Sequence, residues 1–351
     1  MTDTMSMNSR SVFIRYLLLL LATILVSSLF LPGIYGIPYP QPLGPQFLPQ
    51  IKRVHVDEIS RHQAELVLIG DSVLLQGVDP KKLSEGLERK VYSLSEPGSG
   101  SAIWYLMLKN LILDASPRPR YVAILFRDTM LTAPTYRTTG RYFALVDDFA
   151  KQDEPLLSQL AYINPKTPLD RFAEQYLPLY SARWQIRAGL DRSIRYTVPS
   201  VLLDCSIGCI DTAMDSVFGE GEVDVAALNR AVEEAEESLY EPGMMNFEGQ
   251  LDQSFLPTML QLANDNDITL IFIRTKTLTY PELASEPAEL QLYITSLENH
   301  IKAHGALYID FAHDERIKEF YFYDVKHLTE EGKAAFTPML AEELKSILDS
   351  R

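Results

Sequence analysis

The sequence is poor in the residues that build metal sites and disulfide frameworks. It contains 2 cysteines and 6 histidines among 351 residues. So few cysteines exclude a disulfide-rich scaffold and a zinc site made of four thiolates. The histidines show no metal-ligand spacing with carboxylates, so we expect neither a metal nor a cofactor.

Positive charge is also scarce. The chain has 32 lysines and arginines against 47 aspartates and glutamates, which gives a net charge of −15 at pH 7. A chain this acidic is repelled by phosphate backbones, so we expect no nucleic-acid partner. Hydrophobic content of 46% and charged content of 23% are ordinary for a globular protein. The length favours two domains, or one domain with a large insertion.

An apolar segment lies close to the N-terminus. Residues 12–31 carry a single charge, Arg15, near their start. A helix of this length spans about 30 Å, the thickness of the hydrocarbon core of a bilayer. Arg10 and Arg15 precede most of the apolar run and favour a cytoplasmic tail over residues 1–11, followed by a transmembrane helix over 12–31.

The alternative to an anchor is a cleaved signal peptide. The apolar run is longer than the hydrophobic region of a typical signal peptide, and Leu29-Phe30-Leu31 offers no small-residue cleavage site. We therefore favour the anchor. Both interpretations place the rest of the chain outside the cytoplasm.

A proline-rich segment follows the apolar run. Five prolines fall within residues 32–45. Proline at this density favours an extended polyproline II conformation and opposes a helix. We predict a semi-rigid stalk over residues 32–65 that holds a soluble domain away from the membrane.

From residue 66 onward, short apolar runs alternate with helix-like segments. Such runs are typical of strands that are buried on both faces of a parallel sheet. Strand–helix alternation predicts a doubly wound α/β domain over residues 66–349. The runs predicted as strands are 66–69, 91–94, 121–126, 268–273 and 306–310.

Little strand signal appears between the third and fourth predicted strands. A connection as long as residues 131–267 is an inserted subdomain, and we expect it to be mainly helical. Near its end, Glu233, Glu234, Glu236 and Glu237 predict a solvated face of one helix.

Three residues at the predicted strand ends and near the last helix carry the chemistry of a nucleophilic enzyme. Ser72 follows the first strand, and Asp324 and His327 precede the last helix. A serine hydroxyl needs a base within hydrogen-bond reach, and the imidazole needs a carboxylate that fixes its tautomer. Ligands of open parallel sheets bind at the carboxyl ends of the strands. We therefore predict Ser72 as nucleophile, His327 as base and Asp324 as the orienting acid.

These motifs resemble those of the SGNH (GDSL-type) hydrolase superfamily. Gly70-Asp71-Ser72 is similar to the block with the family's nucleophile, and Asp324-Val325-Lys326-His327 is similar to its Asp-x-x-His block. The resemblance covers residues 66–129 and 267–349, and neither the insertion nor the first 65 residues. It implies a flavodoxin-like parallel sheet and an acyl-ester reaction through a Ser72 acyl-enzyme.

The sequence departs from the family at the groups that bind the oxyanion. Ser95 stands where an asparagine often lies, and counting on from it leads to Gly100 as the glycine donor, with Gly98 as the second choice. The third block lacks its asparagine and has Arg127 instead. Arg127 or Arg274, both at predicted strand ends, could replace the missing donor. Alternatively, both arginines only pair with acidic neighbours.

These departures, together with the anchor, resemble membrane-anchored SGNH-like proteins of bacterial polysaccharide O-acetylation. The resemblance implies an extracytoplasmic, periplasmic enzyme on the bacterial inner membrane. It would transfer O-acetyl groups to a cell-envelope or exported polysaccharide, or remove them, with an integral-membrane acyltransferase as a partner. The alternative is a non-catalytic glycan-binding or scaffolding module of a polysaccharide export complex, which the lost asparagine favours and the retained serine, aspartate and histidine oppose.

The two cysteines lie close together in the insertion. Outside the cytoplasm a disulfide between Cys205 and Cys209 is permitted. Gly208 allows the tight turn that this short spacing needs. We predict a disulfide, with a redox-active pair as the alternative.

Overall fold

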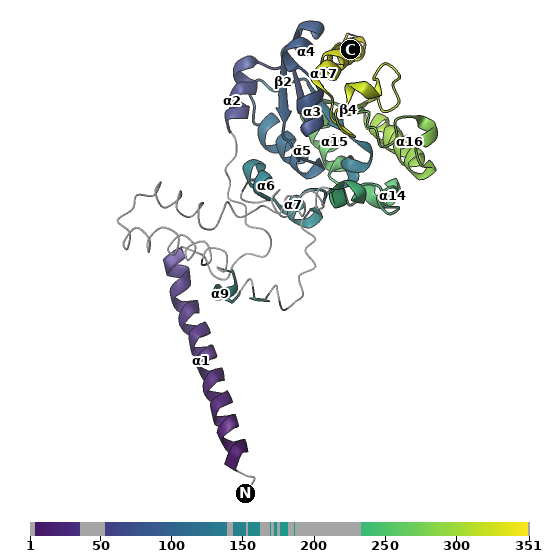
Figure 1. Ribbon diagram of the computed structural model, residues 1–351. Helices are drawn as coiled ribbons and strands as arrows, with labels where there is room; N and C mark the ends of the chain where they lie inside the picture. The colour runs from purple at the N-terminus through teal and green to yellow at the C-terminus, as the bar shows by residue number, and fades with distance from the viewer. Residues whose placement is uncertain are drawn as a thin grey trace, which may run out of the picture. The chain divides into compact units, whose positions relative to one another are not determined.

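The structure is a computed structural model, which describes residues 4–35, 53–138, 143–151, 154–161 and 233–349, together with 169, 172–173, 176–181 and 186 (Figure 1). The chain divides into two compact units. One comprises residues 1–45 and 164–229, and the other comprises residues 46–163 and 230–351. The predicted disulfide between Cys205 and Cys209 lies outside the described residues.

In the first unit, the main described element is the helix α1 (Thr4–Tyr35). Its segment Ser11–Phe30 is long and apolar enough to cross a membrane, with a mean hydropathy of 2.2. The predicted span over 12–31 therefore lies on one helix of suitable length and composition. A signal sequence near the N-terminus has the same properties. The short helix α9 (Pro178–Ser181) also belongs to this unit.

The second unit is built on a five-stranded sheet in which every pairing is parallel. Its strand order is β2-β1-β3-β4-β5, so the order reverses between β1 and β3. The strands are β1 (Leu66–Gly70), β2 (Val91–Ser95), β3 (Tyr121–Phe126), β4 (Thr269–Arg274) and β5 (Leu307–Asp310). The predicted doubly wound α/β fold is confirmed.

Alternate residues of the strands face two separate hydrophobic layers, because side chains in a strand point in turn to opposite faces. Val67 and Ile69 join the layer that contains Trp104, and Leu66 and Leu68 join the opposite layer. The first layer is covered by α2 (Arg53–His62), α5 (Ser101–Met107), α14 (Phe247–Leu251), α15 (Leu256–Asn264) and α16 (Ala288–Ala303). The second layer is covered by α3 (Ser72–Gly77), α4 (Pro80–Leu87) and α17 (Glu330–Leu348). The remaining short helical segments outside the insertion are η1 (Leu108–Ile112), η5 (Leu283–Ser285) and η6 (Glu319–Tyr321).

Helix α2 corrects one sequence prediction. Residues 53–62 lie in the predicted stalk over 32–65, yet they form a helix, and Ile59 is fully buried against the first layer. The physical reason is helical spacing, since Val56 and Ile59 lie three residues apart and therefore on one face. The earlier residues of the predicted stalk, 36–52, lie outside the described residues.

The described parts of the insertion are mainly helical and belong to the core. After β3 the chain forms η2 (Asp128–Thr132), α6 (Phe143–Phe149) and α7 (Pro155–Leu160). Val146, Phe149 and Leu157 are fully buried in the first layer. Both ends of the insertion therefore help to support the carboxyl end of the sheet, where the candidate site lies.

Candidate active site

Ser72 is the first residue of α3 and follows the carboxyl end of β1, from which Asp71 alone separates it. Asp71 caps α3, because its carboxylate accepts a hydrogen bond from the backbone N–H of Val73 at 2.8 Å. Gly70 makes the turn possible: a Cβ atom there would lie 2.7 Å from Cβ of Leu74. The local sequence therefore places the Ser72 hydroxyl at the point where the strand order reverses, where open sheets bind ligands.

Asp324 and His327 share one tight loop between η6 and α17. The Asp324 carboxylate accepts hydrogen bonds from the backbone N–H groups of Lys326 and His327, at 2.9 and 2.8 Å. This turn holds both side chains on one side of the loop. Gly332 is needed where α17 begins, since a Cβ atom there would lie 2.5 Å from the carbonyl oxygen of Tyr321.

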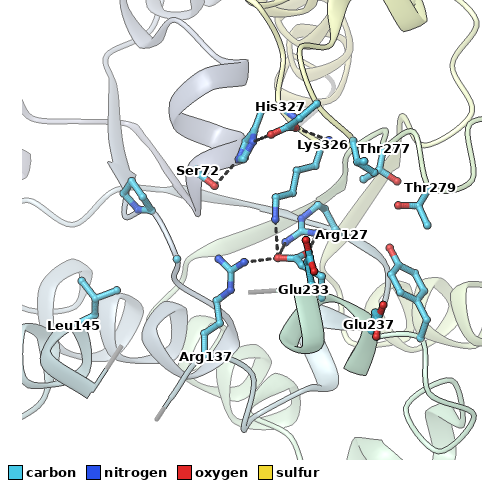
Figure 2. Close-up of a pocket in the computed structure, with 16 residues that line it drawn as sticks. Ser72, Arg127, Arg137, Leu145, Glu233, Glu237, Thr277, Thr279, Lys326 and His327 are labelled. Atoms are coloured by element: carbon cyan, nitrogen blue, oxygen red, sulfur yellow. Dashed lines mark hydrogen bonds and ion pairs between the residues drawn. The ribbon is translucent and has the colours of Figure 1, made fainter. Parts of the chain in front are cut away.

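The three predicted catalytic residues form one hydrogen-bonded chain (Figure 2). Nε2 of His327 lies 2.8 Å from Oγ of Ser72, and Nδ1 of His327 lies 2.7 Å from Oδ2 of Asp324. With the Nδ1 proton donated to Asp324, Nε2 accepts the Ser72 hydroxyl proton. Burial raises the pKa of Asp324, but the hydrogen bond from His327 and the two backbone N–H groups outweigh it, so the pKa lies below the ordinary 3.8. Asp324 is thus a carboxylate at neutral pH and can stabilise an imidazolium.

This triad opens into a pocket with a volume of about 760 Å³. Ser72, His327 and Asp324 line it on one side, and Gly98 and Arg127 also line it. A cavity of this size accepts a small-molecule ester or part of a carbohydrate chain.

Backbone N–H groups near Ser72 are the candidates for binding the oxyanion. The N–H of Ser72 lies in the first turn of α3, where N–H groups have no acceptor within the helix. Gly98 lines the pocket and has a φ of +84°, which favours glycine. Gly100 instead caps α5, and a Cβ atom there would lie 2.9 Å from the Tyr136 ring. The structure therefore brings the second-choice glycine to the pocket, and it does not bring Gly100.

Arg127 follows β3 directly, and its guanidinium reaches Asp71, the residue next to the predicted nucleophile. Its Nη2 lies 3.4 Å from Oδ2 of Asp71, and its Nη1 lies 2.5 Å from Oε2 of Glu236. Arg127 is 2% exposed and lines the pocket. Arg127 therefore pairs with acidic neighbours at the edge of the pocket, and its role as an oxyanion donor stays a prediction.

Arg274 is not part of the pocket lining, which corrects its predicted place at the site. Its guanidinium pairs with Asp128 at 2.6 Å, with Asp310 at 3.4 Å and with Glu286. Asp128 follows β3, Asp310 ends β5 and Glu286 follows η5, so the ion pairs of Arg274 join the carboxyl ends of β3, β4 and β5. A buried arginine needs such partners, because an unpaired buried charge is strongly destabilising.

No sequence pattern indicated the charged cluster around Glu236. Oε1 of Glu236 accepts hydrogen bonds from the hydroxyl of Tyr136 at 2.6 Å, from Nζ of Lys326 at 2.7 Å and from Arg137. Burial raises the pKa of Glu236, but Arg127, Lys326 and Arg137 outweigh it and hold the pKa far below its ordinary value. The prediction of a solvated helix face over 233–237 is therefore wrong for Glu236, although Glu233 and Glu237 are exposed.

No group of three or more histidine, cysteine, aspartate or glutamate side chains within the described residues is placed to hold a metal ion. The triad needs none, since its chemistry is carried by one hydroxyl, one imidazole and one carboxylate.

Comparisons with known proteins give similarities of fold only. No family model matches the sequence, and no curated protein matches it. A GDSL-like lipase from Bacteroides thetaiotaomicron matches with 11% identity and a TM-score of 0.38, over 82% of this chain and 90% of that one. A catalytic mutant of an acetylxylan esterase from Geobacillus stearothermophilus matches with 9% identity and a TM-score of 0.38, over 80% and 93%. An α/β-hydrolase enzyme from the metagenome of Lake Arreo, Spain, matches with 12% identity and a TM-score of 0.33, over 79% and 94%.

Proposed function

We propose that this protein is a serine-dependent acyl-ester enzyme of the SGNH type. The observation that carries the proposal is the hydrogen-bonded chain from Ser72 through His327 to Asp324 at the mouth of a pocket. Three residues from opposite ends of one domain meet in the geometry that activates a serine hydroxyl.

The reaction proceeds in two halves. Oγ of Ser72 attacks the ester carbonyl carbon while Nε2 of His327 takes the hydroxyl proton. The N–H groups of Ser72 and Gly98 bind the oxyanion. The tetrahedral intermediate then collapses, the bond to the alcohol oxygen breaks, and His327 gives its proton to the leaving alcohol. In the second half, water or another hydroxyl attacks the acyl-enzyme with His327 as base, and Ser72 regains its proton.

For the substrate, we propose O-acetyl groups of a cell-envelope or exported polysaccharide. Support comes from the sequence resemblance to membrane-anchored proteins of polysaccharide O-acetylation and from the apolar length of α1. On this proposal α1 is a single-pass anchor in the bacterial inner membrane and the α/β domain is periplasmic. An integral-membrane acyltransferase that delivers acetyl groups is the proposed partner.

We further propose that the acyl group passes to a sugar hydroxyl and not to water. Part of the pocket lining comes from the insertion, including Leu145 and Tyr240. The hydroxyl of a bound sugar reacts with the acyl-enzyme faster than water does, because the site holds it in the reactive orientation. The sugar also displaces water from a covered site. Giving the protein an activated acetyl ester, with and without oligosaccharide, tests this point. Acetylated sugar formed at the expense of free acetate supports transfer, and free acetate unaffected by oligosaccharide supports hydrolysis.

Labelling with a serine-reactive fluorophosphonate tests the proposal as a whole. The full-length protein should be labelled, and Ser72→Ala should abolish the label. Ser285→Ala, which removes an exposed hydroxyl in η5, is the matched control and should keep it. A folded protein that is not labelled at Ser72 would contradict the proposed enzymatic function and favour the non-catalytic glycan-binding module.

A further inference from the structure

Four side chains converge on a single carboxylate oxygen in the pocket. Oε1 of Glu236 contacts the hydroxyl of Tyr136, Nζ of Lys326, Nη2 of Arg137 and, at 3.5 Å, Nη2 of Arg127. A carboxylate oxygen has about two lone pairs, so these donors outnumber the acceptor sites of that atom. Figure 2 shows Arg127, Arg137 and Lys326 reaching toward one shared point. Nη1 of Arg127 also donates to Oε2 of Glu236 at 2.5 Å, so the whole carboxylate receives five contacts for about four acceptor sites. Glu236 is therefore surrounded by at least as many donors as it can accept.

The positive groups are more deeply buried than the carboxylate they surround. The side chains of Arg127, Arg137 and Lys326 are 3%, 6% and 16% exposed, whereas that of Glu236 is 21% exposed. Arg127 follows the central strand β3, and Lys326 lies inside the Asp324–His327 turn. Glu236 instead comes from the returning end of the insertion. Arg127 and Lys326 belong to the framework of the site, and Arg137 lies near the start of the insertion. The Glu236 side chain can turn away through its own rotatable bonds.

This cluster opposes the charge of the whole protein. The chain carries a net charge of −15, yet three cations line the same pocket as Ser72. Asp71 and Glu236 are the carboxylates that pair with them among the described residues. If Glu236 turned away without a replacement, Lys326 would lose the carboxylate that it pairs with among the described residues, and Arg127 would keep Asp71 at 3.4 Å. An anion in the position of Glu236 therefore stabilises the pocket.

We propose that Arg127, Arg137 and Lys326 form a subsite for a carboxylate of the substrate, and that Glu236 occupies this subsite until the substrate displaces it. The proposal rests on the proposed function, because it names the class of ester that reaches Ser72: one with an anionic group beside the scissile ester. An arginine side chain can bind a carboxylate through two parallel N–H···O hydrogen bonds, and the carboxylate of Glu236 already fits between these donors. A neutral ester has no carboxylate that can displace Glu236, so it binds while Glu236 still occupies the subsite.

The test compares two esters that differ in one charge. Para-acetoxybenzoate is anionic, and para-acetoxybenzamide is a neutral ester of the same shape. Each kcat/KM value is divided by the rate of uncatalysed hydrolysis, which removes the difference between the two leaving groups. We expect the full-length protein to prefer the anionic ester by about tenfold, the scale of one charge-assisted hydrogen bond.

Three variants locate the preference. Glu236→Gln should increase the preference for the anionic ester and lower its KM, because the competing carboxylate is gone. Lys326→Gln should bring the preference toward one. Glu237→Gln is the matched control: it removes an equal charge from the same pocket lining, and among the described residues Glu237 forms no ion pair with the cluster. It should change the preference much less than Glu236→Gln.

Binding without turnover gives a second measurement. Benzoate should raise the melting temperature of the protein more than benzamide does, and Lys326→Gln should remove the difference, because a ligand that binds the folded state stabilises it. If Glu236→Gln fails to fold, this comparison and the Lys326→Gln kinetics decide the question. Equal turnover of both esters, unchanged in Lys326→Gln, would overturn the subsite and leave the proposed function standing. An equal effect of Glu237→Gln and Glu236→Gln would also overturn it. Loss of fluorophosphonate labelling concerns the proposed function alone.

Discussion

Nε2 of His327 lies 2.8 Å from Oγ of Ser72, although 255 positions separate the two residues in the sequence. The parallel sheet explains the contact. Ser72 follows β1, which lies between β2 and β3 in the sheet, and His327 precedes α17, which packs on the same hydrophobic layer as α3. The carboxyl ends of parallel strands share one edge, so the first and last loops of the domain meet there.

The triad should behave as one unit when it is mutated. Ser72→Ala and His327→Ala should each lower kcat for para-acetoxybenzamide by about a thousandfold or more, and the double variant should be no worse than either single variant. Asp324→Asn should cost less than either, because Asp324 is 42% exposed and water can replace part of its interaction with His327. Steady-state kinetics on the three variants and the double variant measure the ranking. Multiplicative losses in the double variant would show that Ser72 and His327 act separately.

Asp324 should give the folded protein a pH-dependent stability. Its pKa is lower in the folded protein than the ordinary 3.8, so its stabilisation is present above that pH and is lost as the pH falls through the folded-state pKa. Asp324→Asn removes the titration. The difference in melting temperature between the natural protein and Asp324→Asn should therefore shrink as the pH falls below 3.8. A difference that grows on acidification would contradict the assignment.

Gly332 should be required for the geometry of the catalytic loop. A Cβ atom at Gly332 would lie 2.5 Å from the carbonyl oxygen of Tyr321, so Gly332→Ala must move the loop that carries Asp324 and His327. We expect a loss of about 1–3 kcal/mol in the free energy of unfolding and a large fall in kcat. Gly243→Ala is the control, because no described atom lies within 4 Å of its added Cβ. Urea unfolding and ester kinetics on the two variants show whether the effect is specific to Gly332 or follows from replacing any glycine.

Ser99 should stabilise the fold by linking Trp104 to Gly70, the residue two positions before Ser72, through its hydroxyl. Nε1 of Trp104 donates to Oγ of Ser99 at 2.9 Å, and Oγ of Ser99 donates to the carbonyl oxygen of Gly70 at 3.2 Å. Ser99→Ala leaves the buried indole N–H without its partner and should cost about 1–3 kcal/mol in urea unfolding. Ser99→Ala and Trp104→Phe each remove the same hydrogen bond. The double variant should therefore lose less free energy of unfolding than the sum of the two single variants. Additive losses would show that this hydrogen bond contributes little.

The apolar segment of α1 should hold the protein in a membrane. An alkaline-phosphatase fusion made after residue 60 should be active and should sediment with membranes, since the segment Ser11–Phe30 is long and apolar enough to cross a bilayer. Replacing Leu18 and Leu21 with arginine should release the fusion from the membrane fraction. A soluble natural protein that begins near residue 32 would contradict the anchor.

The sheet could be predicted because its inner strands β1, β3 and β4 are buried on both faces. Such strands consist of continuous apolar runs, and the predicted start of β4 differs from the observed one by a single residue. Ser72, Asp324 and His327 could be predicted because each lies in a short motif at a strand end or a helix start. The identity of the pocket glycine could not, since the count from Ser95 does not reveal that Gly98 takes the positive φ and Gly100 packs against Tyr136.

The charged cluster could not be predicted from sequence for a different reason. Four glutamates on one helix predict a face in water, and nothing in their spacing shows that Glu236 meets Arg127 from another part of the chain. The long-range pairing of Arg274 with Asp128 and Glu286 was likewise hidden, because a strand-end arginine has the same local sequence whether it faces a substrate or a carboxylate.

The order of the catalytic residues along the chain also controls when activity can arise. A ribosome delivers Ser72 early, and it delivers Asp324 and His327 only with the last loop before α17. Until that loop is made and docked, the serine hydroxyl is as unreactive as any other alcohol. On the proposed function, nascent chains and chains broken off before residue 324 therefore leave the esters around them intact, and activity arises only after the loop with Asp324 and His327 has been made.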